Sequence, residues 1–229
     1  MANILLTGGS RGIGAAIAAA LHGETLAVQA TRGAYAADFA DPRAPRQLWE
    51  RTIAALGTVD VLINNAGVFE ANPLETAHED WVGGWERTQR INLTASAELC
   101  RLAILDWQRR KVGGRIVNVA SRAAYRGDSP AHWHYAASKA GMVAMTKTIA
   151  RGYARNGILA FAVCPGFTMT GMAEDYLASR GGDKLLADIP LGRVAMPDEV
   201  GEMVRWLAVA APASMTGAVL DVNGASYVR

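Results

Sequence analysis

The stretch TGGSRGIG, Thr7 to Gly14, follows the short apolar run ANILL and opens the alanine-rich run GIGAAIAAALHG. Its glycines, Gly8, Gly12 and Gly14, are spaced G-x3-G-x-G. Glycines at a strand-to-helix turn let backbone N–H groups at the helix N-terminus approach a phosphate without interference from a Cβ atom. They also suit a tight turn that binds nothing. Because this turn joins the first expected strand to the first expected helix, we interpret it as a dinucleotide-binding turn.

Short apolar runs alternate with longer helical patterns along the rest of the chain. Continuously apolar strands are typical of a parallel sheet that is covered on both faces. Repeated strand–helix alternation implies right-handed crossovers, so we expect an α/β fold with a doubly wound parallel sheet and helices on both faces. The seven strands we expect are ANILLTG, TLAVQAT, AADFAD, VDVLINNAG, GRIVNVAS, ILAFAVCPG and AVLDVNG.

The pattern predicts a single domain, residues 1–229, with no linker or low-complexity segment. Helices are expected from the glycine turn to Gly23, over APRQLWERTIAALG, over about residues 85–111, over about 133–156, and over PDEVGEMVRWLAVA. Residues 167–196 fit no element firmly. A loop of that length is uncommon unless it forms a lid or a binding segment, so we interpret it as a substrate-binding loop.

Composition excludes several function classes. The net charge of +2 and the lack of a long basic run argue against a nucleic-acid partner. Cys100 and Cys164 are far apart and have no metal-ligand spacing, so we expect neither a metal site nor a disulfide. No window approaches the roughly 18 apolar residues of a membrane span. With no signal-peptide pattern at its start, the sequence predicts a cytoplasmic protein.

The residues that end the second expected strand bear on which dinucleotide binds. A site for NAD usually has an acidic residue there, which holds the ribose 2′-hydroxyl. This chain has Thr31 and Arg32, and Arg11 lies within the glycine turn. A guanidinium group can bind a 2′-phosphate bidentately. Both arginines would also suit a solvated surface, so the pattern favours NADP(H) and leaves NAD(H) possible.

Tyr135 and Lys139 stand four residues apart in WHYAASKAG and would share one face of a helix. Tyrosine titrates near 10, which makes it a poor acid–base group at neutral pH. A fixed ammonium beside it favours the phenolate, and lowering the pKa by ~3 units corresponds to ~4 kcal/mol. An exposed pair does not supply that much. The spacing alone therefore also fits an ordinary solvated pair.

Two further residues favour a catalytic interpretation. Ser121 ends the expected strand GRIVNVAS, and ligands bind at the carboxyl ends of the strands in such sheets. Asn92 lies within a helical pattern, where an asparagine is mildly unfavourable unless it serves a purpose. An exposed helical asparagine is the alternative.

Together these motifs resemble the short-chain dehydrogenases/reductases of the ordinary short form. Among these, the 3-oxoacyl-thioester reductases and the sugar or alcohol dehydrogenases share the motifs, which do not separate the two groups. The resemblance rests on motifs in the family's order and spacing: TGGSRGIG, NNAG at Asn64 to Gly67, Asn92, Ser121, YAASK, CPGFTMT at Cys164 to Thr170, and IPLGRVAMPDEV at Ile189 to Val200. It covers essentially the whole chain. It implies a Rossmann fold, an oxidoreductase that exchanges hydride between a nicotinamide cofactor and a ketone or secondary alcohol, and a homotetramer or homodimer.

The resemblance also implies roles for individual residues. Tyr135 would be the general acid or base, Lys139 would hold the nicotinamide ribose and lower the tyrosine's pKa, and Ser121 would bind the carbonyl oxygen. Asn92 would hold a water that links Lys139 to solvent. The implied cofactor contacts are Gly8, Ser10, Arg11, Gly12, Ile13, Gly14, Arg32, Asp38, Phe39, Asn65, Ala66, Gly67, Tyr135, Lys139, Pro165, Gly166 and Thr168.

The chain departs from the family pattern in three places. The segment between the second strand and ADFAD is too short for the usual helix, which weakens the assignment of Arg32. The segment before Asn92 looks longer than usual, and DVNG replaces the commoner DGG near the end. None of these changes touches the four catalytic positions. A nucleotide-binding redox sensor without catalytic activity is the alternative function, because a fold does not dictate function.

The substrate is less well defined by the sequence. Met169, Met172, Tyr176 and Leu177 either form an apolar wall of the substrate site or pack a short helix. Arg122 and Arg126 follow the catalytic serine. They either meet an acidic group, such as a carboxylate or a phosphopantetheine phosphate, or are ordinary solvated arginines.

Overall fold

The computed structural model describes residues 1–170 and 182–229. Its strands form one parallel sheet in the order β2-β1-β3-β4-β5-β6. Chain order reverses between β1 and β3, which is the switch point of a doubly wound sheet. The strands are β1 Asn3–Leu6, β2 Thr25–Val28, β3 Val61–Asn64, β4 Gly114–Val119, β5 Ile158–Pro165 and β6 Val219–Val222.

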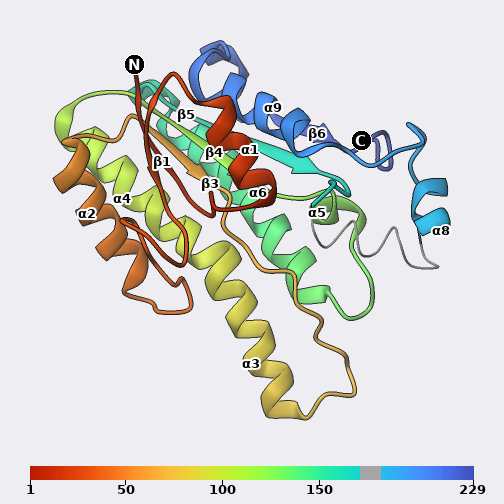
Figure 1. The fold of residues 1–229 in the computed structure, drawn as a ribbon. Coiled ribbons are helices and arrows are strands. Elements are labelled where there is room, and N and C mark those ends of the chain that lie inside the picture. Colours follow the sequence, from red (N-terminus) through yellow and green to blue (C-terminus); the bar gives the residue numbers. More distant parts are fainter. Residues whose placement is uncertain (171–181) are drawn as a thin grey trace.

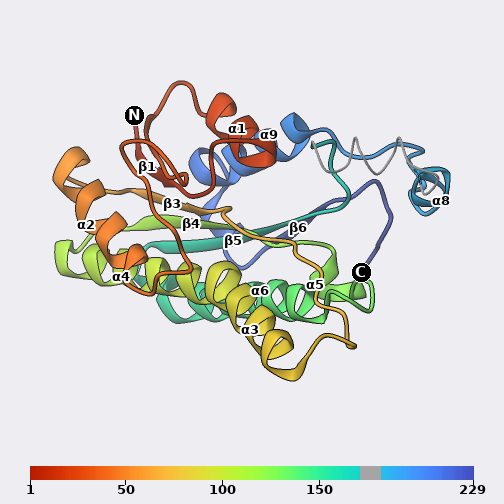
Figure 2. The same ribbon diagram turned by 60° about the horizontal axis from the view of Figure 1, so that its bottom comes forward.

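Helices cover both faces of the sheet, as Figure 2 shows. Helices α1 (Gly12–Ala20) and α9 (Pro197–Val209) pack together on one face. The opposite face carries α2 (Ala44–Leu56), α4 (Ala95–Arg110) and α6 (Trp133–Tyr153), with α3 (His78–Gln89) extending beyond the sheet (Figure 1). The shorter helical segments are η1 Arg90–Thr94, α5 Ala123–Arg126, η2 Ala154–Asn156, α8 Gly182–Ala187 and η3 Ala213–Met215.

The two faces of the sheet have separate apolar cores, because successive strand residues point to opposite sides. In β1, Leu5 joins the core beneath α2 and α4, whereas Ile4 and Leu6 join the core beneath α1 and α9. In β5, Ala160 joins the core beneath α2 and α4, and Phe161 joins the core beneath α1 and α9. This arrangement explains why the strands read as continuous apolar runs.

The expected seven strands were wrong in number: the described residues form six. AADFAD makes no strand, and only Ala36 forms an isolated bridge, with Ala30. Its apolar residues, Ala37 and Phe39, are buried in the core cluster beside α2 instead. Between β2 and this segment the chain has only turns, so the helix usual in the family is absent, as the short spacing predicted.

The expected helix over 85–111 begins earlier, at His78, and passes through one π-helical turn, η1, around Asn92. A π-helical turn often marks a functional site. The expected helices over 133–156 and from Pro197 are present. Part of the segment 167–196 is helical, since α8 spans Gly182–Ala187. Across the described residues, no helix is both long enough and apolar enough to span a bilayer.

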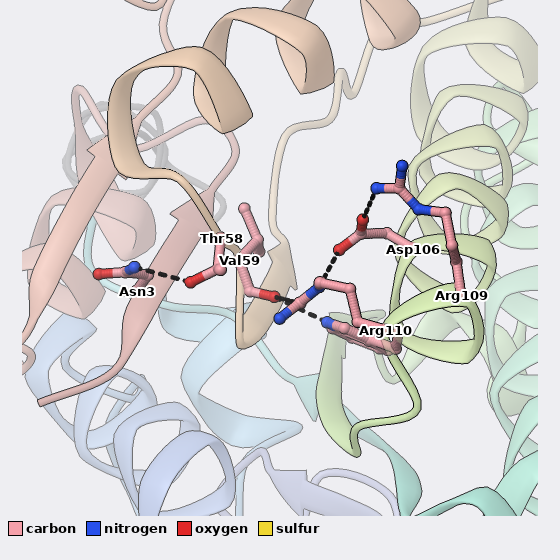
Figure 3. Close-up of polar contacts among 7 residues, drawn as sticks. Asn3, Thr58, Val59, Asp106, Arg109 and Arg110 are labelled. Carbon is pink, nitrogen blue, oxygen red and sulfur yellow. Dashed lines mark hydrogen bonds and ion pairs between the residues drawn. The ribbon is translucent and has the colours of Figure 1, made fainter.

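A polar network fixes α4 at the edge of the sheet where β3 begins (Figure 3). The backbone carbonyl of Val59 accepts hydrogen bonds from the Trp107 indole at 2.7 Å and from Arg110 at 3.2 Å. Asp106, only 7% exposed, binds Arg109 and Arg110. The basic cluster at the end of this helix therefore has a structural role.

Candidate active site

The glycine turn is packed tightly against the segment that follows β3. The Thr7 hydroxyl accepts the backbone N–H groups of Asn65, at 3.0 Å, and Ala66, at 3.1 Å. In return the Asn65 amide donates to the carbonyls of Thr7 and Gly8. A Cβ on Gly14 would lie 1.9 Å from the Gly8 carbonyl oxygen, so the turn has room only for glycine there. Gly8, at φ +67°, needs glycine for its backbone conformation as well.

Helix α1 begins directly after this turn. Its N-cap residue, Arg11, makes no side-chain capping hydrogen bond. The first N–H groups of a helix have no partner within the helix, and they carry the positive end of its dipole. The turn and the start of α1 together therefore form a cradle suited to a phosphate. Arg11 and Ser10 are exposed beside it.

Gln29 is a residue of this cradle that the sequence analysis missed. It is 4% exposed at the end of β2. Its side-chain oxygen accepts the Gly8 N–H at 2.8 Å, and its amide donates to the Ala37 carbonyl at 2.8 Å. Gln29 thus ties the glycine turn to the segment expected to carry the adenosine contacts. A polar residue at the end of a buried apolar strand was the available signal.

Of the other residues expected to contact the adenosine, Arg32 and Asp38 have accessible side chains, whereas the side chain of Phe39 is not accessible. Arg32 and Asp38 are exposed, and the Asp38 carboxylate accepts the Ala40 backbone N–H at 2.9 Å. Phe39 is 5% exposed and belongs to the apolar core. Its ring is therefore committed to packing, and only its backbone remains available to a ligand.

Ser121 and Tyr135, the expected catalytic pair, lie side by side, since the Ser121 side chain acts on the pKa of the Tyr135 hydroxyl. Ser121 follows β4, and its hydroxyl also accepts the Ala123 backbone N–H at 3.1 Å. Tyr135 lies in the first turn of α6. The loop between the two residues thus folds back, as predicted, and brings both hydroxyls to the carboxyl edge of the sheet.

Lys139 is buried one turn farther along α6, at 4% exposure. Its ammonium nitrogen donates to the Val119 carbonyl at 2.9 Å and lies 5.8 Å from the centroid of the Tyr135 ring. Gly67 is close by, because a Cβ there would lie 3.6 Å from this nitrogen. Lys139 is therefore buried and Tyr135 half-buried at the sheet edge, so the two are not an ordinary solvated helical pair.

Asn92 approaches the same place from η1. Its side-chain oxygen accepts the Val68 N–H at 2.8 Å, and its amide donates to the Val68 carbonyl at 3.0 Å. The amide also lies 3.3 Å from the Ser138 hydroxyl, which donates to the Tyr135 carbonyl. Asn92 thus links the loop after β3 to α6, the helix that carries Tyr135 and Lys139.

Burial dominates the protonation of the central pair. It raises the pKa of Tyr135 to about 12, and the Ser121 side chain opposes that rise. Burial lowers the pKa of Lys139 to about 8. The resemblance implied a lowered tyrosine pKa, but in this structure the ammonium is bonded to Val119 and does not reach the phenol oxygen. At neutral pH the phenol is protonated, which is the form that can donate a proton.

Phe69 contacts Tyr135 directly and was not anticipated. Its ring meets Tyr135 edge-on, with centroids 4.8 Å apart, and stacks on His132 at 3.9 Å. Phe69 is 41% exposed, although large apolar side chains are usually covered. An aromatic residue directly after NNAG-Val is the feature of the sequence that marks this position.

The segment after β5 forms the last part of the candidate site, at the carboxyl edge of the sheet. The Pro165 carbonyl accepts the Arg122 backbone N–H at 2.9 Å, Gly166 packs against Asn223, and the Thr168 hydroxyl donates to the Gly166 carbonyl. Of the expected apolar wall, Met169 packs with Ile189 and Val194. Met172, Tyr176 and Leu177 lie outside the described residues.

Comparisons with known proteins agree with this geometry. The model of a family described as enoyl-(acyl carrier protein) reductase matches residues 8–225. The chain belongs to the short-chain dehydrogenase/reductase family. It is therefore an oxidoreductase, as its motifs predicted.

Two curated relatives illustrate the similarity. A 3-oxoacyl-[acyl-carrier-protein] reductase from Synechocystis is 34% identical, over 96% of this chain and 94% of its own length. An acetoacetyl-CoA reductase from Shinella zoogloeoides is 30% identical, over 97% of each chain. Among solved structures, a putative 2-deoxy-D-gluconate 3-dehydrogenase from Agrobacterium tumefaciens with bound NADP is 27% identical, with a TM-score of 0.89, covering 100% of this chain and 97% of that one.

Proposed function

We propose that this short-chain dehydrogenase/reductase is an NADP(H)-dependent carbonyl reductase in which Tyr135 is the general acid. The observation that carries this proposal is that the Ser121 side chain and the Tyr135 hydroxyl lie side by side, near the buried ammonium of Lys139. Two hydroxyl donors that converge at the carboxyl edge of a sheet suit the binding of a ketone oxygen.

The chain's own residues would act as follows. Ser121 and Tyr135 hydrogen-bond the carbonyl oxygen and so polarise the carbonyl group. When bound, the nicotinamide supplies the hydride that reduces the carbonyl carbon. Tyr135 then transfers its phenolic proton to the alkoxide oxygen, which gives the secondary alcohol. Lys139 favours the resulting phenolate by its charge, and Asn92 holds the loop after β3 against the catalytic helix.

The cradle supports a dinucleotide as the cofactor. Gly8, Gly12 and Gly14 let the turn pack tightly against Ala66, Thr170 and its own backbone, and the uncapped start of α1 that follows suits a pyrophosphate. Arg11 and Arg32 are exposed, and in the part of the chain that the structure describes neither makes an ion pair. They are therefore available to a 2′-phosphate, which favours NADP(H) over NAD(H). The bound NADP of the structural neighbour agrees with this preference.

The relatives indicate the substrate class. Those named above as reductases act on 3-oxoacyl-[acyl-carrier-protein] and on acetoacetyl-CoA. A 3-oxoacyl compound, as a thioester or as a small 3-oxo acid or ester, is therefore the substrate class we propose. The homotetramer implied by the family stays a prediction, which sedimentation analysis of the purified protein would test.

A titration of the purified protein with NADPH and with NADH, followed by intrinsic fluorescence, tests the cofactor. We expect NADPH to bind at least tenfold more tightly, and the Arg11→Ala/Arg32→Ala double variant to lose most of that preference. Equal or reversed preference would contradict the assignment of these arginines.

Turnover of acetoacetyl-CoA with NADPH tests the chemistry, with oxidation of NADPH followed at 340 nm as the readout. Tight binding of NADPH without turnover of any ketone would instead support the non-catalytic redox sensor. Failure to bind either dinucleotide would overturn the whole proposal.

A further inference from the structure

Arg122 follows the catalytic Ser121 directly, so their Cα atoms are about 3.8 Å apart. Its backbone N–H is held by the Pro165 carbonyl at 2.9 Å. The guanidinium carbon lies 5.8 Å from the centroid of the Phe167 ring. Arg122 therefore lies between the turn that carries Ser121 and the start of the segment after β5, which we expect to bind the substrate.

The Arg122 side chain is only 13% exposed. Its Nη1 atom is buried without a hydrogen-bond partner in the part of the chain that is described. The nearest carboxylate oxygen, Oδ2 of Asp188, is 3.9 Å from Nη1, too far for a hydrogen bond. Arg122 thus has a long ion pair with Asp188 but a buried N–H with no hydrogen-bond acceptor among the described residues. Leaving such a donor unsatisfied is costly, and water, an ion or a ligand can complete it.

The carboxylate of Asp188 is already engaged elsewhere. Arg126 donates to the same Oδ2 atom at 2.7 Å, and also to the Ser226 carbonyl at 3.3 Å. Asp128 is the other acid that acts electrostatically on Arg122, and its side chain accepts the Ser129 N–H at 2.8 Å. Two guanidinium groups thus share one carboxylate oxygen, and Arg122 is the one left without a hydrogen bond to it.

We propose that Arg122 binds an anionic oxygen group of the substrate, namely a carboxylate within a few atoms of the reacting carbonyl. The site rests on the proposed function, because Ser121 fixes where that carbonyl lies. A guanidinium beside the serine would select a small 3-oxo acid over its neutral ester, since only the acid completes the buried donor. Removing Arg122 would then weaken the preference of the enzyme for the acid over the ester.

The test compares acetoacetate with methyl acetoacetate, which present the same ketone with and without a charge. For Arg122→Met, with NADPH, we expect the ratio of kcat/KM for the acid to kcat/KM for the ester to fall at least tenfold. Arg122→Lys should lower this ratio less than Arg122→Met does. The matched control, Arg155→Met, changes an exposed arginine far from the sheet edge and should leave the ratio unchanged.

Asp188→Asn provides a second test that keeps Arg122 in place. It removes the carboxylate that competes for Arg122, so the same ratio should rise about threefold or more. A ratio unchanged in both Arg122→Met and Asp188→Asn would overturn the inference, even if Arg122→Met folds poorly. A wild-type enzyme that reduces the ester and excludes the acid would also overturn it and would leave the proposed function standing. Reduction of neither ketone, nor of acetoacetyl-CoA, would overturn both.

A phosphate of the substrate carrier is the other source of the same anion. Acetoacetyl-CoA and the neutral N-acetylcysteamine thioester of acetoacetate distinguish it. If Arg122→Met weakens turnover of the coenzyme A thioester alone, the anion is that phosphate, and the assignment to a nearby carboxylate is wrong.

Discussion

The side chain of Asn92 binds both backbone polar groups of Val68, accepting its N–H at 2.8 Å and donating to its carbonyl at 3.0 Å. The two residues lie in different elements: Val68 follows the NNAG segment and Asn92 lies in the π-helical turn η1. A side-chain amide is suited to this double contact because it has one acceptor and one donor group. Asn92 is therefore a positioning residue for the loop beside the catalytic pair.

Asn92→Ala should destabilise the protein, because it leaves two backbone groups of Val68 unpaired in a buried region. An unsatisfied buried group costs about 1–3 kcal/mol, so we expect a loss of about 2–4 kcal/mol in the free energy of urea unfolding. The control, Asn156→Ala, alters an exposed asparagine and should change the free energy of unfolding by less than about 0.5 kcal/mol. Equal effects of the two substitutions would contradict this role.

Gly14→Ala should weaken binding of the dinucleotide at least tenfold. The added Cβ would lie 1.9 Å from the Gly8 carbonyl and 2.6 Å from the Asn65 amide, so the cradle has to open. Overpacking of this kind also costs about 1–3 kcal/mol of stability. Gly152→Ala is the matched control, since a Cβ at that position in α6 meets nothing within 4 Å. It should stabilise the protein by roughly 0.5–1 kcal/mol and leave the dissociation constant unchanged.

Glu199 should contribute stability that disappears in acid. Its side chain binds Arg193 and accepts the Met196 N–H at the start of α9, and these contacts lower its pKa to about 2. The unfolded carboxyl titrates near 4.5. The stabilisation is therefore complete above about pH 4.5 and is lost as pH falls toward 2.

Because Glu199 is 39% exposed, solvent screens part of this effect, and we expect about 1 kcal/mol from the cap. The difference in Tm between wild type and Glu199→Gln should be largest at pH 7 and should shrink toward pH 3. Glu202→Gln, which breaks only the helical pair with Arg205, is the control. A difference in Tm that stays constant with pH would argue against the cap.

Cys100 should make the protein less stable in alkali. Burial raises the pKa of its thiol to about 12, whereas an unfolded cysteine titrates near 9.0. The folded state thus keeps a proton that the unfolded state loses, and stability falls as pH rises from about 9 toward 12. Lys139 acts in the opposite direction, because burial lowers its pKa to about 8.

Cys100→Ala removes the effect of the thiol on stability and leaves the effect of Lys139. The free energy of unfolding of the variant, measured in urea with a reductant present, should fall less steeply between pH 9 and 10.5, by about 1 kcal/mol per pH unit. The slope is the measured quantity, because the smaller side chain lowers stability at every pH. Parallel slopes in the two proteins would show that the thiol does not titrate on unfolding.

Much of the sheet could be predicted because burial on both faces leaves a plain sequence signal, the continuous apolar run. The signal failed at AADFAD, where Ala37 and Phe39 are buried under α2 without forming a strand. These two residues are buried because α2 covers them. They reach that position from a turn and not from a strand. The run is also too short to extend the ladder beyond its single bridge at Ala36.

The early start of α3 was missed for a different reason. Gly83 and Gly84 lower helix propensity, which favoured a later start. In the structure, a Cβ on Gly84 would lie 3.0 Å from the Asn72 side chain, which donates to the Trp81 carbonyl. A tight tertiary contact therefore favours glycine at this position, and helix propensity alone does not register such a contact.

The motifs predicted four catalytic positions, which stay predictions, but they did not predict the surroundings of these residues. The edge-on contact of Phe69 with Tyr135 and the bond from Gly8 to Gln29 join residues far apart in the chain. No local pattern encodes those distances. The direction of the tyrosine's pKa also depends on burial, which only the assembled site defines.

Tyr135→Phe should abolish turnover while binding of NADPH stays within about threefold of wild type. The substitution removes only the hydroxyl that meets Ser121 and leaves the ring in contact with Phe69. Loss of a general acid typically lowers rates by 10²–10⁴-fold, and we expect a decrease in kcat at the upper end of that range. Tyr153→Phe, at the far end of the same helix, is the matched control and should retain full activity. The measurement is kcat for acetoacetyl-CoA together with a fluorescence titration of each variant. Turnover by Tyr135→Phe within tenfold of wild type would mean that another group donates the proton, and the mechanism would have to be abandoned.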